Sequence, residues 1–471
     1  MRFQSRFEKI TPEEAGIRSE DLLALLRDYT DGGLSEEVHA FALLRHGRLI
    51  AEGAFSPFRI EDRHEIFSGT KMLVGAAVGF AVSEGLLTEK DLIAELLPEH
   101  MPPSPSEELL TLDISHLLSM TLGMQGGAVH TRTALEGGSS RIRVILARPF
   151  AHRPGEVFSY DNEASYLLAA ILARKTGESL AAYLTPRLFA PLGIPTPSLG
   201  EDEEGNTYGW MGARLSIEEY AALGELYRAD GIYQGKRILP EGFVRRATAC
   251  RIVTPPSPGA DWGEGYAAHL WRGRYDSFRF CGAFGQMCAV FPKQGIVFAV
   301  MSGADYFSIP HILEKFYHHI LSRLSEEPLA PSSLCLDRFL KDLTLPARYT
   351  APLPTLSLLD GIRFALPETA PYEYATLLPT SDSLVLTLYK NNTPIRIALG
   401  LTRPIETVIP KDKTAFPYPT ERHDTHLSAH ACFENTGEIT ATLRLLHTPY
   451  AITVRFLLDE KKAVFTPMRL L

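Results

Sequence analysis

The stretch that decides the fold is "HEIFSGTKMLVGAAVGFAVSEGLL", residues 64–87. Nearly every residue from Met72 to Val82 is apolar, which predicts a helix that is buried on all sides. Ser68 stands just before this helix and Lys71 stands at its beginning. We consider three explanations for the pair: a phosphate-binding loop, an ordinary helix cap, and a serine nucleophile with its base.

The first two explanations fit the sequence poorly. A phosphate-binding loop needs a glycine-rich run that ends in Gly-Lys-Ser/Thr, whereas here Thr70 precedes Lys71. A capping serine favours Glu or Gln three residues later, because the first turn of a helix carries partial positive charge. Lys71 is electrostatically unfavourable at that position. Capping would therefore account for Ser68 but not for the lysine.

The third explanation uses the lysine. Two residues three positions apart lie on the same face of a helix, within hydrogen-bonding reach of each other. To act as a base near neutral pH, a lysine must have its pKa lowered by about 3 units from roughly 10.4, a bias of about 4 kcal/mol. Burial and the helix dipole both act in that direction. The S-x-x-K pattern is weak by itself, so this hypothesis needs companion residues.

A second motif lies in "GEVFSYDNEASYLLAAIL", residues 155–172, where Tyr160-Asp161-Asn162 precedes another apolar helix. Tyr160 could exchange protons with Lys71, and the Asn162 amide could bond both the lysine and a substrate carbonyl. In the alternative interpretation, Asp161 or Asn162 caps the helix and Tyr160 is a packed aromatic residue. The motif alone leaves both interpretations open.

Together these residues resemble the serine β-lactamase and penicillin-binding protein superfamily, particularly its class C-like branch, where S-x-x-K and Y-x-N occur in this order. The resemblance includes "TLDISHLLSMTLGM" (111–124) and "GAFGQMCAVFPKQGIVFAV" (282–300), and it covers roughly residues 10–325. It implies that Ser68 is the acylated nucleophile, that Lys71 and Tyr160 transfer protons, and that Asn162 positions the substrate. It also implies that the protein needs no metal or organic cofactor.

The family's third motif, usually Lys-Thr-Gly or His-Thr-Gly, is altered here to Phe280-Cys281-Gly282. The glycine that permits close approach of a substrate is present. The resemblance implies that the backbone N–H groups of Ser68 and Ala283 form the oxyanion hole. Gly282 and Ala283 are thus predicted to contact the substrate.

Two further residues, Arg279 and Gln286, lie near this motif. Gln286 is close enough in sequence to touch the substrate, although a structural role fits equally well. Phe280 stands where the family carries the Lys or His of this motif, so the motif lacks its cation. Arg279 is the next residue, but strand side chains alternate, which directs Arg279 to the opposite face. A charge-assisted hydrogen bond contributes about 1.5–3 kcal/mol, so the missing cation weakens recognition of a carboxylate. We therefore expect an ester or small amide without that carboxylate as substrate.

Composition limits the class of protein. With 471 residues, of which 45% are hydrophobic and 22% charged, the chain is typical of soluble proteins with more than one domain. A net charge of −9 provides no broad positive field for nucleic acid or an anionic membrane. The first residues lack a signal-peptide pattern, and the five scattered cysteines suggest reduced thiols, so we expect a cytoplasmic protein.

The order of predicted elements indicates an α+β domain over residues 1–330. A helix at 19–29 and a strand pair at 39–55 precede a mainly helical region, 68–248. Strands return between 265 and 303, and a helix follows at 309–327. This order predicts an antiparallel sheet flanked by helices, with a helical lobe, as in the β-lactamase/transpeptidase fold.

Beyond this domain, the Pro-rich stretches "PLAPSSL" (328–334) and "PARYTAPLPTL" (346–356) mark a boundary zone. Residues 331–346 are predicted to be a linker, and residues 347–471 a small antiparallel β domain. Its clearest hairpin is "SLVLTLYKNNTPIRIALGL" (383–401), with its turn at Asn391-Asn392. Two roles stay open for this domain: covering the active site and forming a homodimer.

Two other candidate sites are less convincing. His423, Asp424, His426 and His430 show no firm metal-ligand spacing, and Cys281 has no evident histidine partner to make it a nucleophile. The sequence therefore predicts a serine hydrolase that acts through an acyl-enzyme on a small ester, amide or peptide: an esterase, a D-amino acid peptidase or a β-lactamase-like enzyme. The alternative is a catalytically silent β-lactamase-like binding protein.

Overall fold

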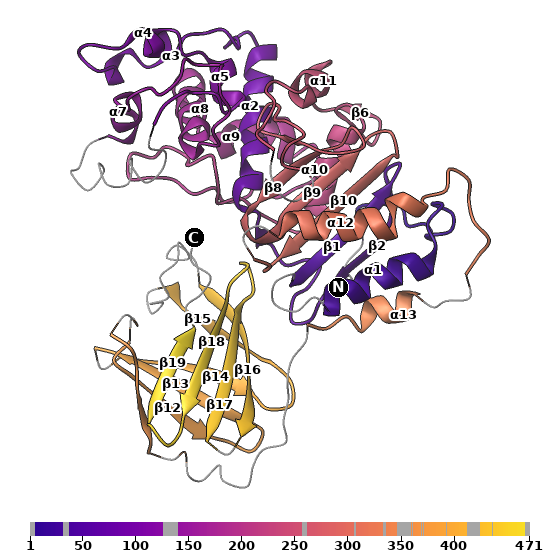
Figure 1. Cartoon of the computed structure of the whole chain (residues 1–471), viewed down its shortest axis with the longest axis vertical. Helices are drawn as coiled ribbons and strands as arrows, with labels where there is room; N and C mark the ends of the chain where they lie inside the picture. The colour runs from indigo at the N-terminus through magenta and orange to yellow at the C-terminus, as the bar shows by residue number, and fades with distance from the viewer. Residues whose placement is uncertain are drawn as a thin grey trace.

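The computed structural model describes residues 5–31, 37–125, 140–256, 261–305, 308–332, 336–345, 359, 361–368, 370, 372–391, 393–411, 424–435 and 437–466. Within these residues the chain forms two bodies, a mixed helix-and-sheet domain and a C-terminal β-barrel (Figure 1).

The first domain is built on a six-stranded antiparallel sheet with the strand order β2-β1-β10-β9-β8-β7. Its two halves come from opposite ends of the domain, because β1 pairs with β10, for instance at Phe41 and Val300. The sheet thus has the arrangement that the element order predicts. The strands are β1 (Val38–Arg45), β2 (Arg48–Ala54), β7 (Trp271–Arg272), β8 (Phe278–Gly282), β9 (Gln286–Phe291) and β10 (Ile296–Ser302).

Helices cover both faces of this sheet. Phe278 and Phe280 of β8 point into the core shared with α2 and α10, whereas Cys281 points into the core shared with α1 and α12. Figure 1 shows α1 and α12 lying together over the second face. The helices are α1 (Ser19–Asp31), α2 (Lys71–Ser83), α3 (Ile93–Leu96), α4 (Glu107–Leu110), α5 (Ile114–Leu118), α7 (Arg141–Leu146), α8 (Asn162–Thr176), α9 (Leu180–Leu184), α10 (Ile217–Arg228), α11 (Phe243–Thr248), α12 (Ile309–His319) and α13 (Leu336–Lys341).

Helix α2 is buried on all sides, as its apolar sequence predicts, and packs against α8 and α9 of the helical lobe. A short 3₁₀ turn, Phe67–Thr70, leads into it. None of the helices in the described part of the chain combines the length and hydropathy that a bilayer span needs.

The C-terminal body is a nine-stranded sheet that closes into a barrel through a parallel contact between β14 and β16. Leucines that alternate along β13, namely Leu384, Leu386 and Leu388, fill its interior. The strands are β11 (Arg363–Ala365), β12 (Tyr374–Pro379), β13 (Ser383–Lys390), β14 (Thr393–Gly400), β15 (Ile405–Ile409), β16 (Thr425–Asn435), β17 (Glu438–Leu445), β18 (Ala451–Leu457) and β19 (Lys462–Thr466).

Three local predictions differ from the structure. Helix α12 ends at His319 instead of continuing toward residue 327, and the chain then turns so that Arg323 pairs with Asp21 of α1 at 2.5 Å. The strand expected over 265–273 is limited to β7, because His269 has a left-handed backbone (φ 59°) that interrupts it. The third difference concerns the expected linker.

Residues 336–345 of the stretch predicted to be a linker, 331–346, pack onto the first domain instead. They include α13, and Leu336, Leu343 and Leu345 are buried in the core beneath α1 and α12. The chain also forms backbone hydrogen bonds with Ser56 on both sides, from Ser56 N–H to Leu343 O and from Leu345 N–H to Ser56 O, each 3.0 Å long. The three buried leucines account for this attachment.

The barrel meets the first domain through the turn between β17 and β18. The Glu65 N–H donates to His447 O at 3.0 Å, and Arg444 forms a buried ion pair with Glu37 at 3.2 Å. Glu65 belongs to β3 (His64–Glu65), which leads directly into the 3₁₀ turn that precedes α2. The barrel therefore contacts the segment that carries Ser68.

Candidate active site

Ser68 and Lys71 face each other at the start of α2. Ser68 lies in the 3₁₀ turn, α2 begins at Lys71, and the Lys71 Nζ donates to Ser68 Oγ over 3.0 Å. Thr70 occupies the N-cap position of α2, and its side chain makes no capping hydrogen bond. The structure therefore gives Ser68 no capping role and places it beside an amine.

The Lys71 amine is almost completely removed from solvent. The residue is 1% exposed, and its Nζ also donates to Asn162 Oδ1 at 2.8 Å and to the Trp210 carbonyl oxygen at 3.4 Å. Burial lowers the pKa of Lys71 well below its usual value, and the nearby Asp161 carboxylate opposes this shift only in part. Asn162 Oδ1 and the Trp210 carbonyl oxygen can accept the two N–H groups of a neutral amine, which leaves its lone pair for the Ser68 hydroxyl.

Asp161 also has a partner of opposite charge. Its carboxylate lies 2.7 Å from the Arg148 guanidinium, and both side chains are buried. Asp161 also caps α8 by accepting from the Glu163 N–H at 3.0 Å. The cap of α8 is therefore Asp161, and Asn162, the first residue of the helix, directs its amide to Lys71.

Tyr160 lies beside the lysine but presents its ring. The Lys71 Nζ is 4.8 Å from the centre of the Tyr160 ring, a cation–π distance. The same ring stacks on Trp271 of β7, with centroids 5.6 Å apart, and it is 39% exposed. Tyr160 thus combines contact with the buried amine and contact with solvent.

The end of β8 lies directly against the 3₁₀ turn. A Cβ on Gly282 would overlap the Ile66 carbonyl oxygen and would sit 3.0 Å from the Phe67 Cβ, so only glycine fits there. Ala283 follows at once and is half-buried. The end of β8 therefore lies against the turn that carries Ser68.

Gln286 does not line this site, and the prediction that it binds substrate is wrong. Its side chain is fully buried: Nε2 donates to the Ser302 carbonyl oxygen at 2.5 Å, and Oε1 accepts from the Ser302 N–H at 3.2 Å. The amide thus joins β9 to the end of β10. Sequence proximity to Gly282 was misleading because the chain turns between the two residues.

The other side chains of β8 behave as strand alternation predicts. Arg279 points away from Ser68 and donates to the Arg272 carbonyl oxygen at 2.8 Å, with its guanidinium 4.8 Å from the Trp262 ring. Cys281 is buried on the same face, and burial raises the pKa of its thiol to about 11. Arg279 therefore does not replace the missing cation, and Cys281 is not activated as a nucleophile.

His269, which belongs to none of the sequence motifs, lies close to the lysine. Burial, followed by the charge of Lys71, lowers the pKa of His269 to about 3. Its ring nitrogens contact Ser165 Oγ at 3.1 Å and the Leu118 carbonyl oxygen at 3.2 Å. His269 is thus a neutral packing residue. The Trp210 carbonyl likewise belongs to no motif, since no side-chain pattern reveals a backbone acceptor.

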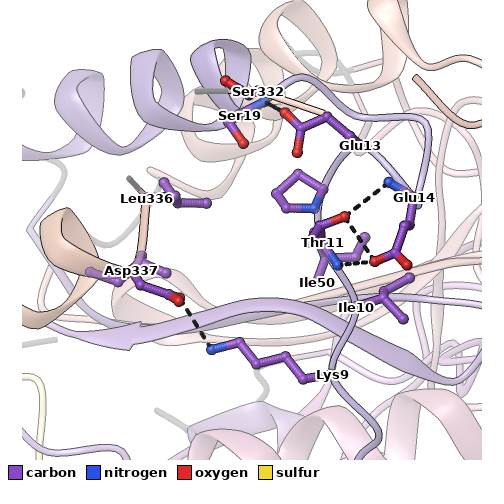
Figure 2. A pocket seen from close by; sticks show the side chains of 12 residues that line it. Lys9, Ile10, Thr11, Glu13, Glu14, Ser19, Ile50, Ser332, Leu336 and Asp337 are labelled. Atoms are coloured by element: carbon purple, nitrogen blue, oxygen red, sulfur yellow. Dashed lines mark hydrogen bonds and ion pairs between the residues drawn. The ribbon is translucent and has the colours of Figure 1, made fainter. Parts of the chain in front are cut away.

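A pocket of about 480 Å³ lies elsewhere, between the N-terminal segment and α13 (Figure 2). Its polar groups bond one another: Lys9 pairs with Asp337 at 3.6 Å, and the Thr11 N–H donates to Glu14 at 2.7 Å. We assign it no site. Among the described residues no three His, Cys, Asp or Glu side chains form a metal-binding group, and His423 lies outside those residues.

Comparison with known proteins agrees with this arrangement. The Beta-lactamase family model matches residues 32–312. A 6-aminohexanoate-dimer hydrolase from Paenarthrobacter ureafaciens is 25% identical over 292 residues, covering 59% of this chain and 72% of that protein. Esterase EstB from Burkholderia gladioli is 29% identical over 212 residues, covering 39% of this chain and 53% of the esterase.

Solved structures share the fold at lower identity. A penicillin-binding protein homologue from Caulobacter crescentus covers 64% of this chain and 97% of its own, with a TM-score of 0.50 and 16% identity. The octameric penicillin-binding protein homologue from Pyrococcus abyssi covers 95% of this chain and 97% of its own, with a TM-score of 0.50 and 15% identity. The match with the Pyrococcus abyssi protein therefore extends into the C-terminal barrel.

Proposed function

Because this chain belongs to the Beta-lactamase family, we propose that it is a serine hydrolase of the class C-like branch that works through an acyl-enzyme. The observation that carries the proposal is the buried Lys71 amine, 3.0 Å from Ser68 Oγ and with a strongly lowered pKa. Relatives whose names describe amide and ester hydrolysis support a hydrolytic reaction.

The proposed reaction begins with a neutral lysine. Lys71 takes the proton of Ser68 as Oγ attacks the substrate carbonyl carbon, and the N–H groups of Ser68 and Ala283 stabilise the oxyanion. The proton then passes, through Lys71 or Tyr160, to the alcohol or amine that leaves as the carbonyl re-forms. Water attacks the resulting ester by the same steps in reverse. This releases a carboxylic acid and restores the serine.

The substrate is proposed to be a small ester or amide without a carboxylate near the scissile bond. Arg279 is engaged on the other face of β8, and Cys281 stands where the family carries Thr. Asn162, whose Oδ1 accepts from Lys71, can offer its amide N–H to the substrate carbonyl. Penicillins, which present a carboxylate, are thus expected to be poor substrates.

A covalent probe tests this proposal. Intact-mass measurement after treatment with a fluorophosphonate should show one adduct on the wild-type protein and none on Ser68→Ala. A screen of short-chain esters, D-amino acid peptides and β-lactams would then identify the acyl group. If the folded wild-type protein forms no adduct, the alternative of a catalytically silent binding protein becomes the better account.

The proposal includes a small-molecule partner and a cytoplasmic location. The net charge of −9 argues against nucleic acid or an anionic membrane. Cys250, Cys281 and Cys288 are free thiols, which suits a reducing compartment. A homodimer remains part of the proposal, to be tested by light scattering.

A further inference from the structure

Two phenylalanines with unusual backbones flank the proposed oxyanion hole. Phe67 immediately precedes Ser68 and has a φ of 47°, and Phe284 immediately follows Ala283 and has a φ of 65°. Bulky side chains rarely adopt this left-handed conformation, which persists only where the surroundings hold it in place. The two backbones that supply the N–H groups are therefore strained, and packing must maintain them.

The packing around both phenylalanines comes from the barrel. Phe67 and Phe284 belong to the apolar core of the barrel and not to the cores of their own domain. Their rings meet edge-to-face at 5.4 Å, and Tyr450 completes the group at 6.1 Å from Phe67 and 5.3 Å from Phe284. All three are 2–3% exposed, and the half-buried Ala283 packs against the same core.

The turn that carries Tyr450 is itself fixed to the first domain. The His447 carbonyl oxygen accepts from the Glu65 N–H at 3.0 Å, and the His447 ring bonds the Arg63 carbonyl oxygen at 2.9 Å. Both contacts lie within five residues of Ser68 in the sequence. The turn thus has a set position relative to the nucleophile.

We propose that Tyr450 is a positioning residue of the active site, supplied by the barrel. Its ring holds Phe67 and Phe284 in their left-handed conformations and so keeps the N–H groups of Ser68 and Ala283 aimed at one point. The proposal rests on the proposed function, since it concerns the oxyanion hole. It gives the C-terminal barrel a part in catalysis.

The test compares three variants of the full chain. In Tyr450→Ala, or in Tyr450→Leu if the former does not fold, the fluorophosphonate labelling rate should fall about 10- to 100-fold. Complete loss of one oxyanion donor costs about 10²–10³ in kcat, and the variant misaligns the donors without removing them. On a short-chain ester, kcat should fall with little change in KM, because these contacts strengthen in the transition state. Tyr450→Phe, which keeps the ring, should stay close to wild type.

Phe456→Ala is the matched control. Phe456 is fully buried in the barrel and pairs edge-to-face with Phe364 at 5.0 Å, away from the three-ring group. Its loss should lower stability but leave the labelling rate of folded protein unchanged. Equal rates in Tyr450→Ala and wild type, or an equal fall in Phe456→Ala, would overturn the proposal.

A crystal structure of Tyr450→Ala provides a readout that does not depend on activity. Phe67 and Phe284 should leave the left-handed region when the third ring is removed. Retention of both positive φ angles would count against a positioning role. Failure of the proposed function is recognised separately, by the absence of any Ser68-dependent adduct on the wild-type protein.

Discussion

An amine surrounded by protein loses the water that stabilises its charged form, and only compensating anions can keep it protonated. Lys71 has one such anion nearby, Asp161, but the buried Arg148 already pairs with that carboxylate. The carbonyl oxygens of Asn162 and Trp210 orient the amine without cancelling a full charge. At the scale of the residue, the site therefore favours a neutral lysine that can accept the serine proton.

Lys71→Met is predicted to abolish this base while keeping the buried volume. Fluorophosphonate labelling should fall at least about 100-fold, the lower range of general-base contributions. In the wild type, labelling should rise with pH through the lowered pKa of Lys71 and then level off, because the neutral amine is the active form. Labelling rates measured across pH check both statements.

The same substitution should not reduce stability near neutral pH. Since the folded-state pKa of Lys71 lies below the unfolded value of about 10.4, the unfolded chain binds one more proton between these two values. The unfolding free energy of the wild type therefore rises with pH across that window. Lys71→Met should lack this rise in urea unfolding experiments. A large loss of stability at pH 7 would contradict a neutral, unfavourably buried amine.

At the scale of elements, the active site depends on the close contact of β8 with the 3₁₀ turn before α2. Gly282 permits this contact, because any Cβ there would overlap the Ile66 carbonyl oxygen. The strand and the turn are far apart in the sequence, and the fold packs one against the other. Two backbone segments can then supply N–H groups to one oxyanion.

Gly282→Ala is predicted to push β8 away from the turn. We expect a loss of about 1–3 kcal/mol in unfolding free energy from overpacking, together with a marked fall in the labelling rate. Gly235→Ala is the control, since Gly235 also has a constrained backbone (φ 75°) but no atom within 4 Å of its added Cβ. That variant should lose stability without losing labelling. Equal labelling rates in Gly282→Ala and Gly235→Ala would show that Gly282 is not needed for the reactivity of Ser68.

At the scale of the whole molecule, the barrel and the first domain share a buried polar contact. Burial would raise the pKa of Glu37, but the hydrogen bond with His39 and the charge of Arg444 lower it to about 2. Arg444 belongs to β17, so this ion pair joins the two bodies. It lies near the Tyr450 turn and contributes to holding that turn in place.

Arg444→Met is predicted to cost about 3–5 kcal/mol, because it leaves the Glu37 carboxylate buried without its partner. With its pKa lowered, Glu37 stabilises the fold above the unfolded value near 4.5, and this contribution is lost as pH falls toward 2. The variant should therefore unfold at a higher pH in acid titrations followed by circular dichroism. Arg455→Met, which breaks an exposed pair with Glu438, should leave the midpoint unchanged.

Local spacing in the sequence determined much of the site and fold. The S-x-x-K spacing places Ser68 and Lys71 one turn apart wherever a helix begins, and the apolar run that follows ensures that the lysine is buried. Alternation along β8 likewise predicted that Arg279 would face away from the site. These predictions succeeded because each depends on residues within one turn or one strand of each other.

Only the tertiary structure decided the remaining features. It showed that Gln286 is enclosed by backbone groups, that the expected linker packs on the first domain, and that Tyr450 lies beside Phe67. Phe67 and Tyr450 are several hundred positions apart and meet only because the barrel packs against the first domain. The periodicity of the sequence does not predict such a contact, because it depends on how the apolar surfaces of the two domains pack together.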